Sequence, residues 1–344
     1  MTMKAKPLSA LLLLVLPCVV SARKLAPEVE RAMAHGAEAE ICLKVCDDKG
    51  APVPNASVRA VFDMLPVPRS VYGKTDTNGV YIARGKTNGN YIEFFVGNKG
   101  YYGSQKKITL IEMGAEHGVK DGKWQPYGDE QKIVLRRIIS PCHLVDIVKW
   151  IYVPRTNEWI GFDMKNGDFV QPFGLGEDAD FEVKVAWDGF SASQCRLCVA
   201  SVRFVDEKNG GYFAPKSNES DFPFDYRANT NKSLEVSFKT INRDGDFNQT
   251  HRPFPQNEFF VTRTRCKLNA DGELISANYG MLRRFDIYPS RESAAVIDYS
   301  GVFNPTPNDT NLEDVETAKR SRHFIRQCEP PPPRKKKRES LWPF

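Results

Sequence analysis

The sequence is poor in histidine and lacks the short strings that mark two large classes of hydrolase. Only five histidines occur in 344 residues, at positions 35, 117, 143, 251 and 323, and neither a G-x-S-x-G nor an H-E-x-x-H string is present. The first string places a serine nucleophile on a tight strand-to-helix turn, and the second places two zinc-binding histidines on one helix face. A histidine-based catalytic site is therefore not indicated.

The apolar run near the N-terminus is well short of the ~20 residues that a membrane-spanning helix needs. It covers residues 10–16, follows Lys4 and Lys6, and is interrupted by Pro17. The small residues Val20-Ser21-Ala22 come next, which is the pattern of a signal peptidase site. We predict a signal peptide over residues 1–22 and an exported protein located in the periplasm, at the cell surface or outside the cell.

Export permits disulfide bonds. Of the eight cysteines, all but Cys18 would remain after cleavage, which is an odd number. Cys42 and Cys46 lie in one alternating run, where they would be ~13 Å apart and too far from each other to bond. Cys195 and Cys198 have the spacing of a zinc or redox pair, but the chain has no second C-x-x-C string. We favour structural roles for the cysteines.

Positive charge is concentrated at the two ends of the chain. The formal net charge is +5, and Lys4 and Lys6 contribute two of these charges within the predicted leader. The run from Arg334 to Arg338, opposed by Glu339, contributes another four, so residues 23–333 carry a net charge of −1. A nearly neutral body is not expected to bind polyanions over its whole surface, and we expect no nucleic-acid partner.

The first half of the chain alternates between apolar and polar residues in short runs. These runs cover residues 41–45, 58–62, 80–83, 91–96, 107–111 and 132–138. Turn sequences rich in glycine and asparagine lie between them, at residues 48–50, 76–79 and 87–89. Regularly spaced short strands with such turns predict a β-sandwich. Before them, residues 23–39 are expected to form one short helix with Pro27 near its start.

Three motifs in this half carry a family resemblance. They are the segment Val45 to Val58, which reads VCDDKGAPVPNASV, the segment Thr75 to Tyr81, which reads TDTNGVY, and Lys99-Gly100-Tyr101. Together they resemble the carboxypeptidase regulatory-like domain, a small transthyretin-like β-sandwich attached to many exported bacterial proteins. The resemblance covers residues 40–138 and implies an accessory module without chemistry of its own. The Tyr-Arg-Gly-Ser ending of transthyretin-like hydrolases is not matched, since Tyr226 to Asn229 reads YRAN and lies outside this region.

A second β-rich region follows Ser140-Pro141-Cys142. Strand-like runs return at residues 181–187, 197–205, 234–240, 259–268 and 273–277, and Asp271-Gly272 marks a hairpin turn. Strings at residues 159–163, 167–170 and 276–280 resemble, more weakly, an uncharacterised set of exported bacterial proteins with the same first domain. We therefore predict an all-β protein with two β-sandwich-like domains in tandem, residues 40–139 and 140–305, after a signal peptide and before a basic disordered tail.

The predicted tail covers residues 306–344. Asn304-Pro305-Thr306-Pro307 is expected to end regular structure. Thr310 to Glu313 has the spacing of a helix capping box, which predicts a short helix. Four prolines, Pro330 to Pro333, predict a stiff polyproline II spacer. The basic run that follows, residues 334–338, is expected to be solvated and disordered, with contact to anionic lipid or polymer as the functional alternative.

Two further motifs suggest bound cofactors but have the wrong context. Gly174 to Ala179 matches the dinucleotide pattern G-x-G-x-x-A, but residues 181–185 alternate like a strand where that site needs a helix. Residues 242–246 have the spacing of a calcium loop, but Pro253 stands where the loop needs a glutamate. We therefore predict neither a cofactor nor a metal ion.

The richest candidate site interleaves aromatic and acidic side chains over residues 159–180. The predicted ligand contacts are Trp159, Phe162, Asp163, Asp168 and Phe173, and Phe169, Glu177, Asp178 and Asp180 accompany them. Such residues stack on sugar rings and accept hydrogen bonds from hydroxyl groups. Because aromatic residues also dominate ordinary cores, we favour the interpretation in which the rings fill a sandwich core and the acids lie in solvated turns.

The preferred functional prediction is an exported, non-catalytic binding or structural protein of the cell envelope or extracellular space. It would recognise carbohydrate or protein, with a polysaccharide or an envelope protein as partner, and exposed sheet edges are a further route to partner binding. The alternative is a carbohydrate-active hydrolase that uses carboxylates of residues 159–180. A facing pair of carboxylates ~5–10 Å apart in an open cleft would favour hydrolysis, whereas scattered acids would favour binding.

Overall fold

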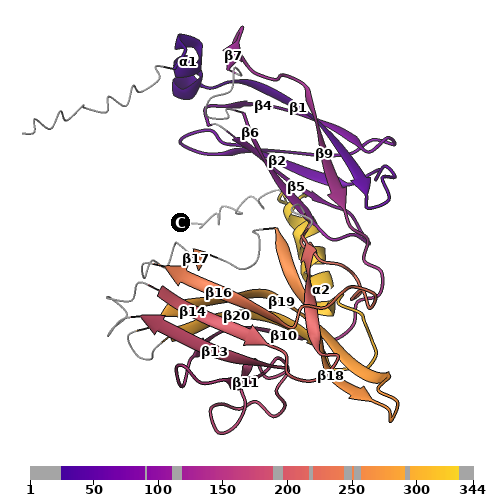
Figure 1. Ribbon diagram of the computed structural model, residues 1–344. Helices are drawn as coiled ribbons and strands as arrows, with labels where there is room; N and C mark the ends of the chain where they lie inside the picture. Colours follow the sequence, from indigo (N-terminus) through magenta and orange to yellow (C-terminus); the bar gives the residue numbers. More distant parts are fainter. Residues whose placement is uncertain are drawn as a thin grey trace, which may run out of the picture.

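The computed structural model describes residues 25–89, 91–110, 118–188, 197–216, 220–243, 250–251, 257–290 and 295–332. Strands dominate the fold, which confirms the prediction of a mostly β protein. The strands form four sheets that stack in two pairs, one within residues 37–135 and one within residues 145–304. Figure 1 shows the two pairs one above the other, with helix α2 (Val315–Gln327) between them. In the described ranges, no helix is both long enough and apolar enough to cross a membrane.

The first pair consists of a five-stranded sheet and a four-stranded sheet. The five-stranded sheet contains β1 (Ala37–Asp47), β4 (Val80–Thr87), β7 (Val119–Lys120), β8 (Lys123–Trp124) and β9 (Asp129–Leu135). In it, β1 pairs antiparallel with β4 and parallel with β9. The four-stranded sheet has the order β3-β2-β5-β6 and contains β2 (Ser57–Phe62), β3 (Arg69–Lys74), β5 (Tyr91–Gly97) and β6 (Ser104–Thr109).

Alternation in these strands turns one set of apolar side chains toward a common core. Alternate residues of β1 are buried, and they pack with buried residues of β2 and β5 from the facing sheet. A slip of one residue in the register of β1 would expose this whole set, so the pattern fixes the pairing. Helix α1 (Pro27–His35) begins at the predicted proline, and its Val29 and Ala32 belong to the same core.

The three motifs of the family resemblance all contain turns whose glycine adopts a positive φ. The angles are +82° at Gly50, +75° at Gly79 and +85° at Gly100. Two backbone N–H groups, at 2.8 and 2.9 Å, donate to the carboxylate of Asp76 in the second turn. A Cβ atom on Gly79 would lie 2.3 Å from the carbonyl oxygen of Val45, so this turn accepts only glycine.

The second pair consists of a five-stranded sheet and a six-stranded sheet. The first has the order β10-β20-β19-β18-β15 and contains β10 (Val145–Tyr152), β15 (Gly210–Pro215), β18 (Glu258–Leu268), β19 (Leu274–Pro289) and β20 (Ala295–Asn304). The second has the order β12-β11-β13-β14-β16-β17 and contains β11 (Ile160–Asp163), β12 (Asp168–Phe169), β13 (Phe181–Asp188), β14 (Leu197–Arg203), β16 (Ser237–Arg243) and β17 (Thr250–His251). The predicted hairpin joins β18 to β19, with Gly272 at φ +76°.

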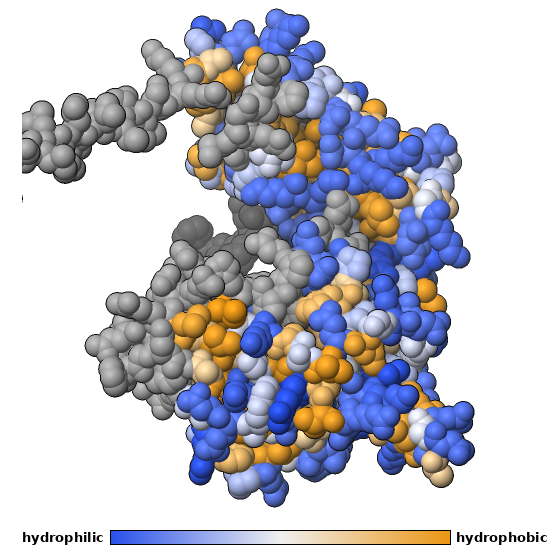
Figure 2. All heavy atoms as spheres, viewed as in Figure 1, coloured by the Kyte–Doolittle hydropathy of each residue, from blue (hydrophilic) through white to orange (hydrophobic). Residues whose placement is uncertain are grey.

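Aromatic rings fill the space between these two sheets. The central ring is that of Phe162, whose centroid lies 5.1 Å from those of both Phe181 and Tyr299. Phe285 completes the cluster at 5.9 Å from Phe162. Every residue of β20 is buried, on both faces of its sheet. On the side of the molecule seen in Figure 2, hydrophilic residues predominate and hydrophobic residues form small separate groups.

Within the described ranges, the cysteines at positions 42, 46, 142, 266 and 328 are free thiols. Cys42 and Cys46 lie on β1 and do not bond each other, as the strand prediction requires. Cys198 is buried in the core of the second half. Cys195 lies outside the described residues, so the role of the C-x-x-C string stays a prediction.

The first part of the predicted tail packs against the second half of the chain. Leu312 is fully buried in the core of the second half, and its N–H donates to the carbonyl oxygen of Tyr226 at 2.9 Å. Helix α2 begins four residues later than the capping box predicts, with Asp314 as its N-cap. Residues 333–344, which carry the basic run, lie outside the described residues.

Glu313, which the capping box places inside a helix, is instead a buried junction between the halves. Its carboxylate accepts hydrogen bonds from the Tyr102 hydroxyl at 2.9 Å and from the N–H groups of Ile139 and Ser140 at 2.8 and 2.6 Å. Tyr102 stacks on Phe222, with ring centroids 4.8 Å apart. Through Glu313, the C-terminal segment therefore forms hydrogen bonds that connect the first half of the chain to the second.

Candidate functional site

A bulge in β18 turns Arg265 toward the interior of the second half. The pairing of β18 with β19 shifts between Thr264 and Lys267, so that two residues of β18 face one residue of β19. Arg265 adopts φ +52°, which is uncommon for a residue other than glycine. The N–H of Cys266 in the bulge donates to Oδ1 of Asn209 at 3.2 Å. The Arg265 side chain is only 19% exposed.

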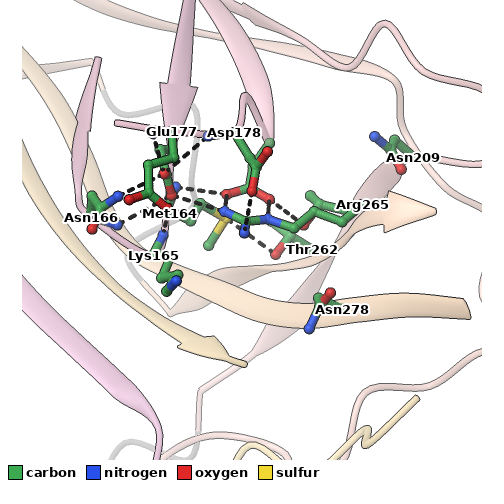
Figure 3. Close-up of polar contacts among 12 residues, drawn as sticks. Met164, Lys165, Asn166, Glu177, Asp178, Asn209, Thr262, Arg265 and Asn278 are labelled. Atoms are coloured by element: carbon green, nitrogen blue, oxygen red, sulfur yellow. Dashed lines mark hydrogen bonds and ion pairs between the residues drawn. The ribbon is translucent and has the colours of Figure 1, made fainter. Parts of the chain in front are cut away.

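Arg265 binds three aspartates at once. Its Nε and Nη2 donate to Oδ1 and Oδ2 of Asp180 at 2.9 and 3.0 Å. Nη2 also donates to Oδ1 of Asp163 at 2.9 Å, and Nη1 donates to Oδ2 of Asp178 at 3.1 Å. The guanidinium carbon lies 4.6 Å from the centroid of the Phe303 ring. Figure 3 shows the Arg265 side chain reaching from its strand to the segment that carries Asp178.

Asp163 is saturated by donors from its own loop and from the next one. Backbone N–H groups of Lys165 and Asn166 donate to it at 2.8 and 3.2 Å, and the Asn166 side chain donates at 2.9 Å. The N–H groups of Glu177 and Asp178 donate at 2.9 and 3.3 Å. Burial alone would raise the pKa of Asp163, but these donors and the arginine hold it below its ordinary value.

Asp180 is the most deeply enclosed of the three acids. Besides Arg265, its carboxylate accepts the Thr264 hydroxyl and the Met164 N–H, both at 2.7 Å. Burial raises the pKa of Asp180, and the bonds from Arg265 and Thr264 oppose that shift. We define Asp163, Asp178, Asp180 and Arg265 as the arginine cluster.

The arginine cluster joins the two sheets of the second half, because Asp163 ends β11 of one sheet and Arg265 belongs to β18 of the other. Asp163 and Asp180 have 0 and 1% of their surface exposed, and their oxygens are occupied by donors of the chain itself. They do not face each other across an open cleft, which is the arrangement that hydrolysis requires. The hypothesis of a hydrolase based on these acids is therefore not supported by the geometry.

The structure separates the five predicted ligand contacts. Phe162 and Asp163 are fully buried, one in the aromatic core and the other in the arginine cluster, so neither contacts a ligand at the surface. Trp159 is half-buried, with its ring centroid 4.1 Å from the Arg203 guanidinium. Phe173 packs against the core, and Asp168 forms an ion pair of 3.6 Å with Lys149. The Phe162 ring therefore lies in the core. Of the acids, Asp163 and Asp180 are buried, Asp168 is half-buried, and Glu177 and Asp178 are exposed.

The glycines of the dinucleotide-like motif have a packing role. A Cβ atom on Gly174 would lie 2.4 Å from the carbonyl oxygen of Phe169, and one on Gly176 would lie 2.8 Å from Cβ of Asp163. The absence of a side chain at both positions lets this loop pack closely against Phe169 and Asp163. As expected, a strand follows the motif rather than a helix.

A different aromatic surface lies on β10, which the sequence analysis did not recognise as a strand. Val148, Trp150 and Tyr152 alternate along β10 on one face and are 62, 58 and 55% exposed. This strand is at the edge of its sheet. Large exposed apolar side chains in a row on an edge strand mark an interaction surface more often than an isolated exposed ring does.

The aromatic row continues across the sheet to β19. The rings of Trp150 and Tyr288 stack with centroids 5.7 Å apart and an interplanar angle of 10°. Because β20 lies between β10 and β19, the two rings meet over it, which accounts for the burial of Val296 and Asp298 on that face. Arg284 lies beside them, 42% exposed, and forms an ion pair of 3.0 Å with Asp298. We call the exposed side chains of Val148, Trp150 and Tyr152 the aromatic face, and the buried Tyr288 packs against it.

Sequence reasoning missed both features for identifiable reasons. Residues 145–152 are apolar at both odd and even positions, so they show no alternation, although their valine, isoleucine, tryptophan and tyrosine content is typical of strands. Arg265 sits in the predicted strand 259–268, where alternation without a bulge gives it no special direction.

Comparisons with known proteins give no family for this chain. No known protein family and no curated protein matches it. Among solved structures, 3-chlorocatechol 1,2-dioxygenase from Rhodococcus opacus aligns at 11% identity and a TM-score of 0.23, over 30% of this chain and 61% of that chain. A DUF3823 family protein from Parabacteroides merdae aligns at 9% identity and a TM-score of 0.20, over 77% of this chain and 97% of that chain. The major pilin subunit BcpA of Bacillus cereus aligns at 12% identity and a TM-score of 0.21, over 80% of this chain and 100% of that chain. We draw neither fold nor function from alignments with such low TM-scores.

Proposed function

We propose that this protein is an exported, non-catalytic binding protein whose aromatic face contacts carbohydrate. The observation that carries the proposal is the exposure of Trp150 and Tyr152 on one face of β10, with 58 and 55% of their surfaces accessible. Aromatic rings of this kind stack on the apolar faces of sugar rings, and neighbouring polar groups bind the hydroxyls. Arg284 is the neighbouring polar group here, because its guanidinium is partly exposed beside the stacked rings.

The geometry of β10 supports an extended ligand. Trp150 and Tyr152 are two residues apart on one strand, which separates their attachment points by ~6.6 Å. Tyr288 is only 8% exposed, and it supports the Trp150 ring by stacking against it. A row of rings on a flat sheet face suits a polymer chain lying along the sheet better than a small molecule, which favours a concave pocket.

The remaining expectations from the sequence complete this proposal. Export rests on the pattern of residues 1–22, and the placement in the envelope or extracellular space follows from it. We further propose that residues 40–139 form an accessory domain of the carboxypeptidase regulatory-like kind, and that residues 140–305 form the domain that carries the binding surface.

A pull-down on insoluble polysaccharides tests the proposed ligand class. The mature chain, residues 23–344, is mixed with cellulose, chitin and peptidoglycan, and the bound fraction is compared with that of a Trp150→Ala, Tyr152→Ala double variant. We expect at least one polymer to retain the mature chain and the double variant to lose most of this retention. Trp159→Ala is the matched control, because the Arg203 guanidinium already stacks over the Trp159 ring.

Two outcomes would overturn the proposal. Equal retention of the double variant and the unmodified chain would exclude the aromatic face as the binding site. Loss of polymer retention in Trp159→Ala alone would instead place the binding site within residues 159–180, as predicted from the sequence. If no polymer retains the mature chain, a protein partner at the free edge of β10 becomes the second candidate, because an exposed edge strand pairs with extended segments. Val148→Lys places a charge on that edge and is expected to abolish such pairing.

A further inference from the structure

A groove with a volume of about 500 Å³ runs along α2 at the joint between the two halves. It is lined by Asp221, Thr317, Arg320, His323, Phe324 and Gln327. Asp221 belongs to the second half, but its N–H donates to the carbonyl oxygen of Gly103 in the first half at 2.7 Å. The volume is within the range of ~300–1,000 Å³ that is usual for ligand sites. The groove is distinct from the aromatic face, since the two share no residue.

Helix α2 directs its polar groups into the groove from successive turns. Arg320, His323 and Gln327 are three and four residues apart, a spacing that places side chains on one helix face. Nη2 of Arg320 donates to the Thr317 hydroxyl at 2.9 Å and lies 3.9 Å from a carboxylate oxygen of Asp146. Because the Arg320 side chain is 67% exposed, its guanidinium retains donors for a ligand.

Asp221 is the acidic group of the groove. Desolvation at the joint raises its pKa to about 6, although part of the residue stays exposed, and Ser321 and Arg320 oppose the shift. The other nearby cation, Arg136, is occupied, because its guanidinium donates to the carbonyl oxygens of Phe222 and Phe224. Protonation of Asp221 therefore changes the balance of charge in the groove.

We propose that this groove binds a ligand bearing a carboxylate, held by Arg320 and His323, and that protonation of Asp221 strengthens the binding. An ionised Asp221 repels an anion placed between it and the two basic side chains. A protonated Asp221 no longer repels the anion and gains an O–H that donates to it.

Calorimetric titration of the mature chain with glucuronate tests the proposal. The carboxylate of glucuronate stays ionised from pH 5 to pH 7, and glucose serves as the uncharged control. A group with a pKa of about 6 is about nine-tenths protonated at pH 5 and about one-tenth at pH 7. The expected affinity for glucuronate is therefore about tenfold higher at pH 5 than at pH 7. A parallel titration with sulfate shows whether the groove prefers a carboxylate to another anion, as we expect.

Three variants assign the effect to the groove. Asp221→Asn is expected to bind glucuronate at pH 7 nearly as tightly as the unmodified chain does at pH 5. Arg320→Gln is expected to lose binding at both values, whereas Arg322→Gln, on the same helix but outside the groove lining, retains it. The proposal is overturned if glucuronate does not bind, if glucose binds equally, or if Asp221→Asn keeps the full pH dependence. Equal or tighter binding of sulfate overturns the assignment of a carboxylate ligand.

Discussion

Replacing Arg265 with alanine removes the cation that pairs with the three acids of the arginine cluster. Alanine keeps the Cβ atom, so the positive φ at this position is equally strained in both proteins. The difference is then the loss of four hydrogen bonds to three carboxylates. Removing one partner of a buried ion pair costs about 3–5 kcal/mol, because the other charge stays buried without compensation.

The structure divides this cost unequally between the acids. Asp163 keeps five other donors, and Asp178 is 67% exposed on its side chain, so both tolerate the change. Asp180 keeps only the Thr264 hydroxyl and the Met164 N–H. We therefore expect a loss of about 3 kcal/mol in the free energy of unfolding at pH 7, concentrated at Asp180.

The loss is expected to depend on pH. Without Arg265, burial raises the pKa of Asp180 further above its value in the unfolded chain, so the folded variant binds more protons than the unfolded one. The stability of the variant then falls as the pH rises above about 4. Urea unfolding at pH 4.5 and pH 7.5, followed by tryptophan fluorescence, measures both quantities.

Arg203→Ala is the matched control for this experiment. Arg203 also forms an ion pair, with Glu182 at 2.6 Å, but its side chain is 42% exposed. Pairs of this kind contribute about 0–1 kcal/mol. A loss in Arg265→Ala no larger than that in Arg203→Ala, or one that does not change with pH, would contradict the account of the arginine cluster.

Three further predictions concern the joint and the turns, each measured by urea unfolding. Glu313→Gln is expected to lose about 2 kcal/mol, because an amide cannot accept from all three donors that the carboxylate binds. Asp221→Asn is expected to gain about 1 kcal/mol at pH 7.5, after allowance for partial exposure, and nothing at pH 4; its carboxyl has a raised pKa of about 6, so the wild-type chain loses stability as the pH rises from about 4 to 6. Gly79→Ala is expected to lose at least about 2 kcal/mol because its Cβ would collide with the Val45 carbonyl, whereas Gly50→Ala, with open space, loses about 1 kcal/mol.

The parts of the fold that sequence reasoning found are those where one face is buried. In β1, apolar residues alternate with polar ones in the sequence, and the structure buries the apolar set on one face of the strand. In β20, all ten residues are buried, so there is no alternation to detect, and the strand was missed. Contacts between residues far apart in the sequence were also not predicted. Glu313 has the spacing of a helix capping box, but its carboxylate binds Tyr102, Ile139 and Ser140.

The candidate site was predictable only in composition. An acidic and aromatic cluster over residues 159–180 was visible, but not that Asp163 and Asp180 would turn inward to an arginine 85 residues or more away in the chain. That contact depends on a bulge, which alternation alone does not indicate. Conversely, Trp150 and Tyr152 lie in a run whose apolar residues cannot be divided into buried and exposed without the neighbouring strands.

The central claim is that carbohydrate binds at the aromatic face, and oxidative footprinting of tryptophan tests it most directly. The mature chain is treated with limiting N-bromosuccinimide, alone and bound to the polysaccharide that retains it, and oxidised peptides are quantified by mass spectrometry. Trp150 is 58% exposed and is expected to be oxidised in the free chain and protected in the bound chain, while Trp159 reacts equally in both. Equal oxidation of Trp150 in the two states, or protection of Trp159 alone, would contradict the claim.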